Sequence, residues 1–351
     1  MNTILKTLLF EWEERELPSI IEREKNLKKY LNLSVPKNIN IFITGSSSKM
    51  SSKEIPTELR GRSLEEKISP LSFSEFLNFE KINIDFEKIE YLEDEKVKIL
   101  SALNEYLMWG GLPEIVLSET AQKREIIQEY YKTVIRKDIS ERSGIKNEEN
   151  LKALLLLLLN STSYSISKLY NTLKSLNYKI GKATLQKYLS SIENSFFLNN
   201  NFIFSYKIKN SLQYPRKNYF IDNGFVRSLS TKFSNNYSRL YENLVFIELQ
   251  RRIDSDTEIN YWKDELNKNE VDFVIRKNTE IVRLIQVCYD ILDSDTKERE
   301  IKGIIKASKK LNCNNLLIIN NELEKEEVIS GKSVKFIPLW KWLVQDKLQE
   351  V

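Results

Sequence analysis

The chain has 351 residues, of which 30% are charged, and its formal net charge is +4. This length predicts about two or three domains with a sizeable core. The absence of histidine from the sequence excludes histidine-dependent triads and histidine metal ligands. The two cysteines, Cys288 and Cys313, give neither a disulfide framework nor a zinc-binding spacing, so we expect a cytoplasmic protein. The longest apolar run, residues 153–159, is far shorter than the roughly 20 residues of a membrane span, so we expect no membrane partner.

Apolar spacing near the N-terminus predicts a helix followed by a strand. Leucines at positions 5, 8 and 9 and Trp12 share one helical face. Residues 39–43 form a dense apolar run that stops at Thr44-Gly45, which is typical of a buried parallel strand. Hydroxyl side chains follow at the carboxyl end of this strand, where open α/β sheets bind ligands.

Three motifs in this region resemble those of a family of archaeal and bacterial AAA-type ATPases. They read ITGSSSK at residues 43–49, LRGR at 59–62 and PLSFSEF at 70–76. The resemblance implies that Ser46 belongs to a sensor of the nucleotide's terminal phosphate. It also implies that Arg60 and Arg62 are phosphate-sensing or inter-subunit arginines.

Two motifs on which nucleotide hydrolysis depends in that family do not occur in this sequence. There is no G-x-x-x-x-G-K-[ST] loop, whose backbone amides and lysine hold the phosphates. There is also no apolar strand ending in Asp-Glu before Ile39. The segment WEERELPSIIERE at 12–24 resembles the family's N-terminus, so an internal deletion explains the gap. We therefore expect ATP only in intact family members, with ATP binding here lost or supplied by a partner.

Residues 73 to about 142 have a helical pattern that is interrupted at residues 109–113, WGGLP. A glycine after a helix, followed by proline, is typical of a helix C-terminus. The resemblance implies a helical lid here. Asp138, in its last helix, is expected to anchor the helix by an ion pair rather than to act as a catalyst.

Residues 151–221 carry a concentrated positive charge. They hold ten basic residues and one acid, Glu193, for a net charge of +9, which leaves the rest of the chain at −5. Such segregation suggests a polyanionic partner. Apolar spacing predicts three helices, with a short turn through Asn177 and Gly181 before the third. Strands expected at 202–204 and 206–209 complete the pattern of a winged helix-turn-helix. A protein-contact role for this domain is the alternative. The candidate DNA-binding residues are Lys179, Lys182, Lys187, Lys207 and Lys209.

The block ends at Tyr219-Phe-Ile-Asp222-Asn-Gly224, which resembles the family's Y-x-x-D-x-G junction. We expect Asp222 to cap the next element or to tie the turn.

Beyond Leu240 the pattern changes to α/β. A helix carries Glu242, the next strand carries Asp272 and a further strand carries Gln286 and Cys288. This order resembles the restriction-endonuclease-like fold, and in particular the C-terminal module of these ATPases. The resemblance makes Glu242, Asp272 and Gln286 the catalytic candidates, with Cys288 in place of the usual lysine.

Oxygen ligands suit Mg²⁺, so Glu242 and Asp272 are the candidate metal ligands. Lys263 is the candidate replacement for the missing lysine, if its side chain reaches the site. We favour an inactive structural pair over an active nuclease, because a buried thiol cannot stabilise charge at a phosphate.

The predicted fold class is therefore α/β multidomain. The expected domains are a truncated ATPase core at 1–72, a helical lid at 73–147, a winged helix-turn-helix at 148–225 and a restriction-endonuclease-like domain at 226–351. DNA binding is the leading function. The alternatives are a metal-dependent DNA nuclease and an inert subunit that oligomerises with itself or with a full-length relative.

Overall fold

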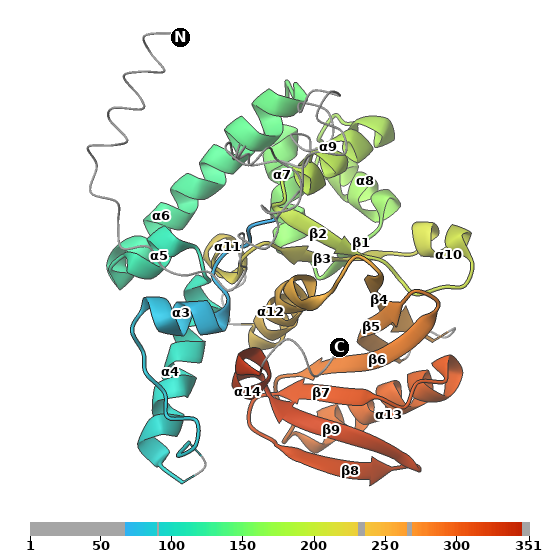
Figure 1. Ribbon diagram of the computed structural model, residues 1–351. Coiled ribbons are helices and arrows are strands. Elements are labelled where there is room, and N and C mark those ends of the chain that lie inside the picture. Colours follow the sequence, from blue (N-terminus) through green and yellow to red (C-terminus); the bar gives the residue numbers. More distant parts are fainter. Residues whose placement is uncertain (1–66, 90, 231–235, 265–268, 346–351) are drawn as a thin grey trace, which may run out of the picture. The chain divides into compact units, whose positions relative to one another are not determined.

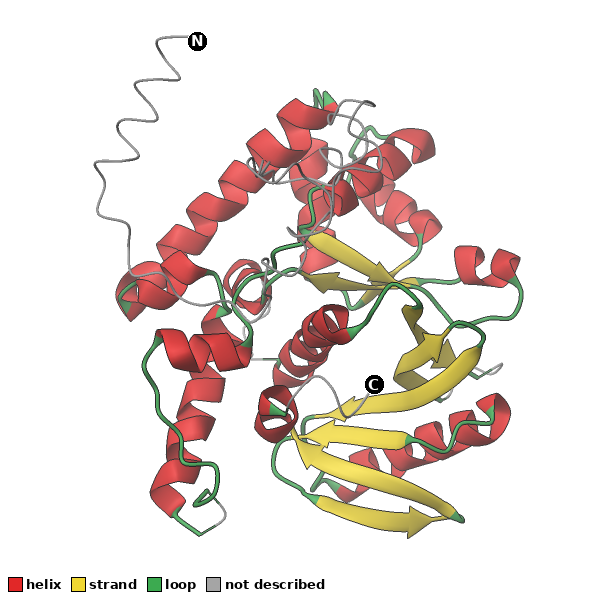
Figure 2. Cartoon of the chain, viewed as in Figure 1, coloured by secondary structure: helices red, strands yellow, loops and turns green. Residues whose placement is uncertain are grey.

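The computed structural model describes residues 67–89, 91–230, 236–264 and 269–345 (Figure 1). These residues form a mixed α/β multidomain structure, which confirms the predicted class (Figure 2). The N-terminal helix, the strand expected at 39–43, and Ser46, Arg60 and Arg62 lie outside the described residues. Within the described part of the chain, no helix is both long enough and apolar enough to cross a membrane.

The first described part is helical, as its pattern predicts. Ser72 begins α3 with a capping box: its hydroxyl accepts from the N–H of Glu75, and its own N–H donates to the Glu75 carboxylate. The long helix α4 ends at Trp109, directly before Gly110. The bounds are α3 Phe73–Phe79, α4 Glu93–Trp109, α5 Pro113–Leu117, α6 Thr120–Thr133 and the π-helix η3 Val134–Glu141.

Residues 148–229, which include the basic part of the chain, combine five helices with a small three-stranded sheet. Helices α8 and α9 have buried leucines on one face. The turn between them lies at residues 176–177, where Asn177 has a φ of +64°, and Gly181 is the extended residue that precedes α9. The sheet is antiparallel, with strand order β1-β3-β2. The bounds are α7 Glu148–Leu159, β1 Ser163–Tyr164, α8 Ile166–Ser175, α9 Lys182–Asn194, β2 Leu198–Asn201, α10 Ile208–Gln213, β3 Arg216–Phe220 and α11 Asn223–Leu229.

The prediction of strands at 202–204 and 206–209 is wrong. The hairpin strands are β2 and β3, one on each side of that segment. Ile203 instead forms an isolated bridge to Tyr261, and the chain then enters α10. The alternating FIF and YKIK patterns do resemble strands, but the backbone hydrogen bonds at 202–204 go to β4. Lys207 and Lys209 therefore do not lie on a strand, although both are exposed.

The second half is built on a six-stranded sheet of order β4-β5-β6-β7-β9-β8. Strands β4, β5 and β6 are antiparallel, β6, β7 and β9 are parallel, and β8 returns antiparallel to β9. The bounds are α12 Tyr237–Arg252, β4 Thr257–Lys263, β5 Glu270–Lys277, β6 Glu280–Cys288, α13 Ser294–Leu311, β7 Leu316–Asn320, β8 Lys325–Ile329, β9 Lys332–Pro338 and α14 Leu339–Val344.

The apolar residues of this sheet belong to two separate clusters. Phe273, Ile275 and Ile285 belong to the cluster that includes the apolar residues of α12. Leu284 and Cys288 belong to the cluster that includes the apolar residues of α13. Burial on both sides explains the nearly continuous apolar runs of β5, β6 and β7. The same burial restricts polar residues to the ends of these strands and to a few positions within them.

Candidate functional site

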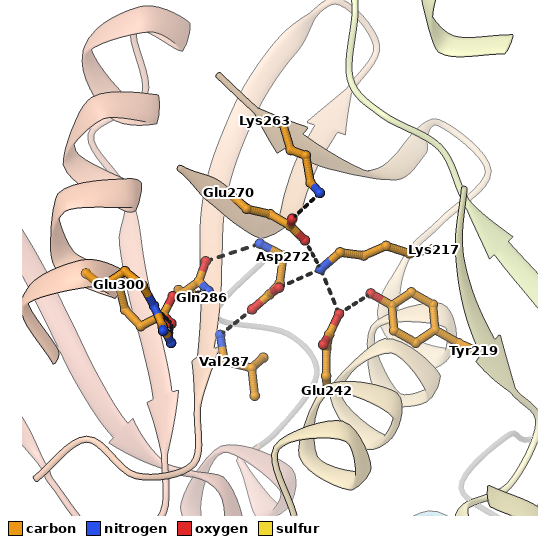
Figure 3. Close-up of polar contacts among 10 residues, drawn as sticks. Lys217, Tyr219, Glu242, Lys263, Glu270, Asp272, Gln286, Val287 and Glu300 are labelled. Carbon is orange, nitrogen blue, oxygen red and sulfur yellow. Dashed lines mark hydrogen bonds and ion pairs between the residues drawn. The ribbon is translucent and has the colours of Figure 1, made fainter. Parts of the chain in front are cut away.

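Polar side chains from several elements meet where β3 approaches β5 and α12 (Figure 3). Lys217 and Tyr219 lie two residues apart on β3, so the strand period directs both to the same side. The same period directs Glu270 and Asp272 of β5 to one side. Glu242 is presented by α12. Residues that are distant in sequence thus share one polar site.

Lys217 is the centre of this site. Its ammonium Nζ lies 2.8 Å from Glu242 Oε1, 2.5 Å from Glu270 Oε1 and 2.6 Å from Asp272 Oδ1. The lysine side chain is only 7% exposed. We call these four residues the Lys217 cluster. Buried charges are stable only when they are paired, and here one ammonium is shared by three carboxylates.

A further layer of hydrogen bonds fixes the carboxylates. Tyr219 donates from its hydroxyl to Glu242 Oε1 at 2.7 Å, and the Val287 N–H donates to Asp272 Oδ2 at 3.0 Å. Gln286 Oε1 accepts from the Asp272 N–H at 3.2 Å, and its Nε2 donates to Glu300 at 2.7 Å. Lys263 pairs with Glu270 Oε2 at 2.7 Å. The geometry of the site is therefore set by several contacts per residue.

Burial and neighbouring charges shift the proton affinities of the site. Burial raises the pKa of Asp272 to about 7, with Lys217 opposing the rise and the carboxylates of Glu242 and Glu270 adding to it. The pKa of Lys217 lies well above its ordinary value, because its three carboxylate partners outweigh the cost of burial. Burial also raises the pKa of the Tyr219 hydroxyl, and the Glu242 carboxylate adds to this rise. Lys217 is therefore a permanent cation and Tyr219 a permanent donor near neutral pH.

A polar cavity of about 330 Å³ opens beside the Lys217 cluster. Its lining includes Lys263, Asn269, Arg299 and Glu300 as well as the cluster itself. Charged groups of both signs thus surround a space large enough for a small polar group.

The structure brings Glu242, Asp272 and Gln286 together, but it places the lysines differently from the expectation. Lys263 contacts Glu270. The lysine that contacts both Glu242 and Asp272 is Lys217, which in the sequence is one of the ten basic residues of 151–221. Tyr219 and Glu270 were also missed. The strand-like alternation Lys217-Asn-Tyr219 just before the Asp222 junction is the one sequence signal that could have pointed to them.

Both carboxylate oxygens of Asp272 and the Oε1 of Glu242, the expected metal ligands, are engaged in this arrangement; Glu242 Oε1 accepts from Lys217 and from Tyr219. Asp272 accepts hydrogen bonds through both carboxylate oxygens, and the Gln286 amide oxygen accepts from a backbone N–H. Among the described residues, no group of three or more Asp, Glu, Cys or His side chains is placed to hold a metal ion. As arranged, these residues do not fit Mg²⁺. Cys288 is buried. Burial is the main cause that raises the pKa of its thiol to about 12, and the negative charge of Glu300 adds to the rise.

The candidate DNA-binding lysines lie on a different part of the molecule. Lys179, in the turn before α9, and Lys182 and Lys187, on α9, are exposed. Lys182 Nζ lies 5.3 Å from the centre of the Tyr170 ring of α8, a cation–π contact. The single acid of the segment, Glu193, lies 3.6 Å from Arg216. The positive charge of this surface is thus not neutralised by its own acid.

Three family models match successive parts of the sequence. They are described as an AAA domain at residues 16–77, a domain of unknown function (DUF8612) at 100–236 and a domain of unknown function (DUF4143) at 237–342. No solved structure matches the chain.

Two relatives extend over most of the chain. The "Uncharacterized protein MJ1544" of Methanocaldococcus jannaschii is 40% identical over 92% of this chain and 73% of its own length. An "Uncharacterized protein" of Haemophilus influenzae is 31% identical over 89% of this chain and 73% of its own length. The chain therefore belongs to the same AAA-type ATPase-like family as these relatives, with an AAA domain followed by DUF8612 and DUF4143 domains.

Proposed function

We propose that this chain is a DNA-binding member of its family, with its phosphate contacts on a winged helix-turn-helix formed by residues 148–225. The observation that carries the proposal is the set of exposed lysines on and before α9, in a segment whose only acid is paired with Arg216. Lysines on one helix and its preceding turn suit contacts to a phosphate backbone. The hairpin of β2 and β3 is the proposed wing.

Two of the ten basic residues of this segment are not available for contacts to DNA. Of the ten basic residues, Lys217 is committed to carboxylates and Arg216 to Glu193. Among the others, the lysines proposed to contact DNA are Lys179, Lys182 and Lys187, because they lie on α9 and directly before it, with Lys207 and Lys209 extending the surface from the segment between β2 and β3.

The C-terminal domain is proposed to be a restriction-endonuclease-like module without nuclease activity. Its helix and strands carry Glu242, Asp272 and Gln286 in the order of that fold, but Cys288 stands where a lysine is usual. ATP binding is proposed to be lost in this chain or to be supplied by an oligomeric partner, either another copy or a full-length relative.

The experiment is a salt titration of binding to a short duplex, followed by fluorescence anisotropy. We expect log affinity to fall linearly with log salt, with a slope of about −0.9 for each phosphate neutralised. Replacing Lys182 and Lys187 by alanine should weaken binding and flatten the slope by roughly 1 for each lost contact.

A charge-matched control replaces Lys302 and Lys309, two exposed lysines of α13, by alanine. This variant should bind as the wild type does. Equal losses in both double variants would show that only net charge matters. Binding without salt dependence, or no effect of the α9 changes, would favour a protein partner and the role of an interaction subunit.

A further inference from the structure

The environment of the Lys217 ammonium is that of a bound cation. Three carboxylates from α12 and β5 lie within 2.8 Å of Nζ. Nζ also lies 5.8 Å from the centre of the Tyr261 ring. The side chain enters from β3, whereas all three carboxylates belong to the chain beyond residue 236. The cation therefore comes from one part of the chain and its anionic ligands come from another.

A divalent metal in the same place would have to compete with this ammonium. Mg²⁺ requires oxygens at about 2.0–2.1 Å in near-octahedral geometry. The facing oxygens of Glu242, Glu270 and Asp272 already accept from Lys217. Two cations within a few ångströms of each other in a buried site would repel strongly, so the ammonium and the metal exclude each other.

We propose that Lys217 is a built-in cation that takes the place of the divalent metal in the nuclease-like module and closes its carboxylates to metal ions. The inference rests on the proposed nuclease-like character of the C-terminal domain and is independent of DNA binding. Its consequence is that the three carboxylates hold β3 against β5 and α12. In a metal-dependent site they would hold an ion and water instead.

The proposal predicts that removing the ammonium opens the site. Lys217→Met keeps much of the apolar stem and leaves three carboxylates without their cation. Mutually repelling carboxylates bind divalent ions to relieve their repulsion, so this variant should gain a site. Lys217→Arg retains the positive charge and should not gain one.

The test is a Mn²⁺ titration of the full chain without DNA, with free Mn²⁺ read by electron paramagnetic resonance. We expect Lys217→Met to bind one Mn²⁺ at least tenfold more tightly than the wild type and Lys217→Arg do. Lys217→Met/Asp272→Asn should lose the gain. Lys217→Met/Glu270→Gln, with one fewer negative charge, is the second variant if Lys217→Met does not fold.

Two results would overturn the proposal. One is Mn²⁺ binding by the wild type that Asp272→Asn abolishes, which would show that metal and ammonium coexist. The other is a folded Lys217→Met variant with no affinity above the wild type. If neither Lys217→Met nor Lys217→Met/Glu270→Gln folds, the test is the comparison of the wild type with Asp272→Asn. The proposal requires that these two proteins bind Mn²⁺ equally weakly. A failure of DNA binding would leave each of these outcomes unchanged.

Discussion

Asp222 accepts a hydrogen bond of 2.7 Å from the backbone N–H of Gly111, a residue 111 positions earlier in the chain. Its other carboxylate oxygen accepts from the N–H of Gly224, also at 2.7 Å, at the start of α11. The carboxylate thus ties the turn after α4 to the junction after β3. Gly110, next to this contact, has a φ of +79°, and a Cβ there would lie 1.7 Å from Asp222 Oδ1.

Asp222→Ala should destabilise the protein, because it leaves two buried N–H groups without acceptors. Each such group costs roughly 1–3 kcal/mol. Gly110→Ala should also destabilise it, through backbone strain and the collision with Asp222. Urea unfolding measures both effects, with Asp290→Ala, a change of an exposed carboxylate, as the control. Unfolding midpoints equal to that of the control would show that this contact is dispensable.

The same carboxyl makes stability depend on pH. Burial raises the pKa of Asp222 from 3.8 to about 6, against the lowering effect of its two backbone hydrogen bonds. Between pH 4 and pH 6 the folded protein then holds a proton that the unfolded chain has lost, so this contribution to stability falls as pH rises. The difference in unfolding free energy between wild type and Asp222→Asn should change by up to about 3 kcal/mol over this range. A difference that is constant with pH would contradict the shift.

Arg251 links α12 to the segment before α3. It donates to Glu248 at 2.9 Å and to the carbonyl of Pro70 at 2.6 Å, and its side chain is 7% exposed. Arg251→Ala should cost about 3 kcal/mol, the lower end for a broken buried pair, because Arg252 still neutralises Glu248.

The matched control for Arg251 is Arg276→Ala, which breaks a pair with the more exposed Glu258. This change should cost less than about 1 kcal/mol. Thermal or urea unfolding compares the two variants. Equal losses would mean that burial does not distinguish the two ion pairs.

We expect no nuclease activity from the wild type with Mg²⁺ or Mn²⁺ on single- or double-stranded DNA. Phosphodiester cleavage needs an activated water and positive charge at the phosphate. Cys288 is a neutral thiol at neutral pH, and Lys217 is held by carboxylates. Cleavage by the wild type that disappears in both Lys263→Ala and Asp272→Ala would make the chain an enzyme with a relocated lysine.

Cys288→Lys, which would restore the usual motif, should reduce stability instead. Cys288 is 3% exposed and shares an apolar cluster with Leu284 and Ile304, so a lysine there would bury a charge. We expect a lower unfolding midpoint and no cleavage. Cysteine to serine at the same position is the size-matched control. Cleavage by Cys288→Lys would show that the longer side chain reaches the carboxylates.

Isolated protein should not bind ATP tightly. The sequence has no loop of the type that would supply several backbone amides and a lysine to the phosphates, and Ser46 to Ser48 cannot replace it. Calorimetry with ATP and Mg²⁺ measures this directly. A micromolar dissociation constant would show that the sequence contains a nucleotide site of another type.

The sequence by itself determined the local elements. The positions of α8, α9, α12, β5 and β6 follow from apolar spacing, because burial of one face imposes a period of 3.6 or 2 on each element. The turn at Gly110 follows from a glycine after a helix with proline close behind it, and the capping role of Asp222 was expected from its place in the family's junction motif. The convergence of Glu242, Asp272 and Gln286 could be anticipated only through the family resemblance.

Only the tertiary structure decided what Lys217 does. In the sequence it is one lysine in a basic segment, and only the strand-like alternation with Tyr219 distinguishes it from Lys182 and Lys187. Its burial depends on three carboxylates at least 25 residues away, which reach it because β3 lies against α12 and β5. The prediction of strands at 202–204 and 206–209 was wrong for the same reason: Ile203 pairs with Tyr261, which lies far along the chain. Whether a charge or a strand is paired depends on which residue lies beside it in the folded chain. The local sequence pattern does not identify that residue.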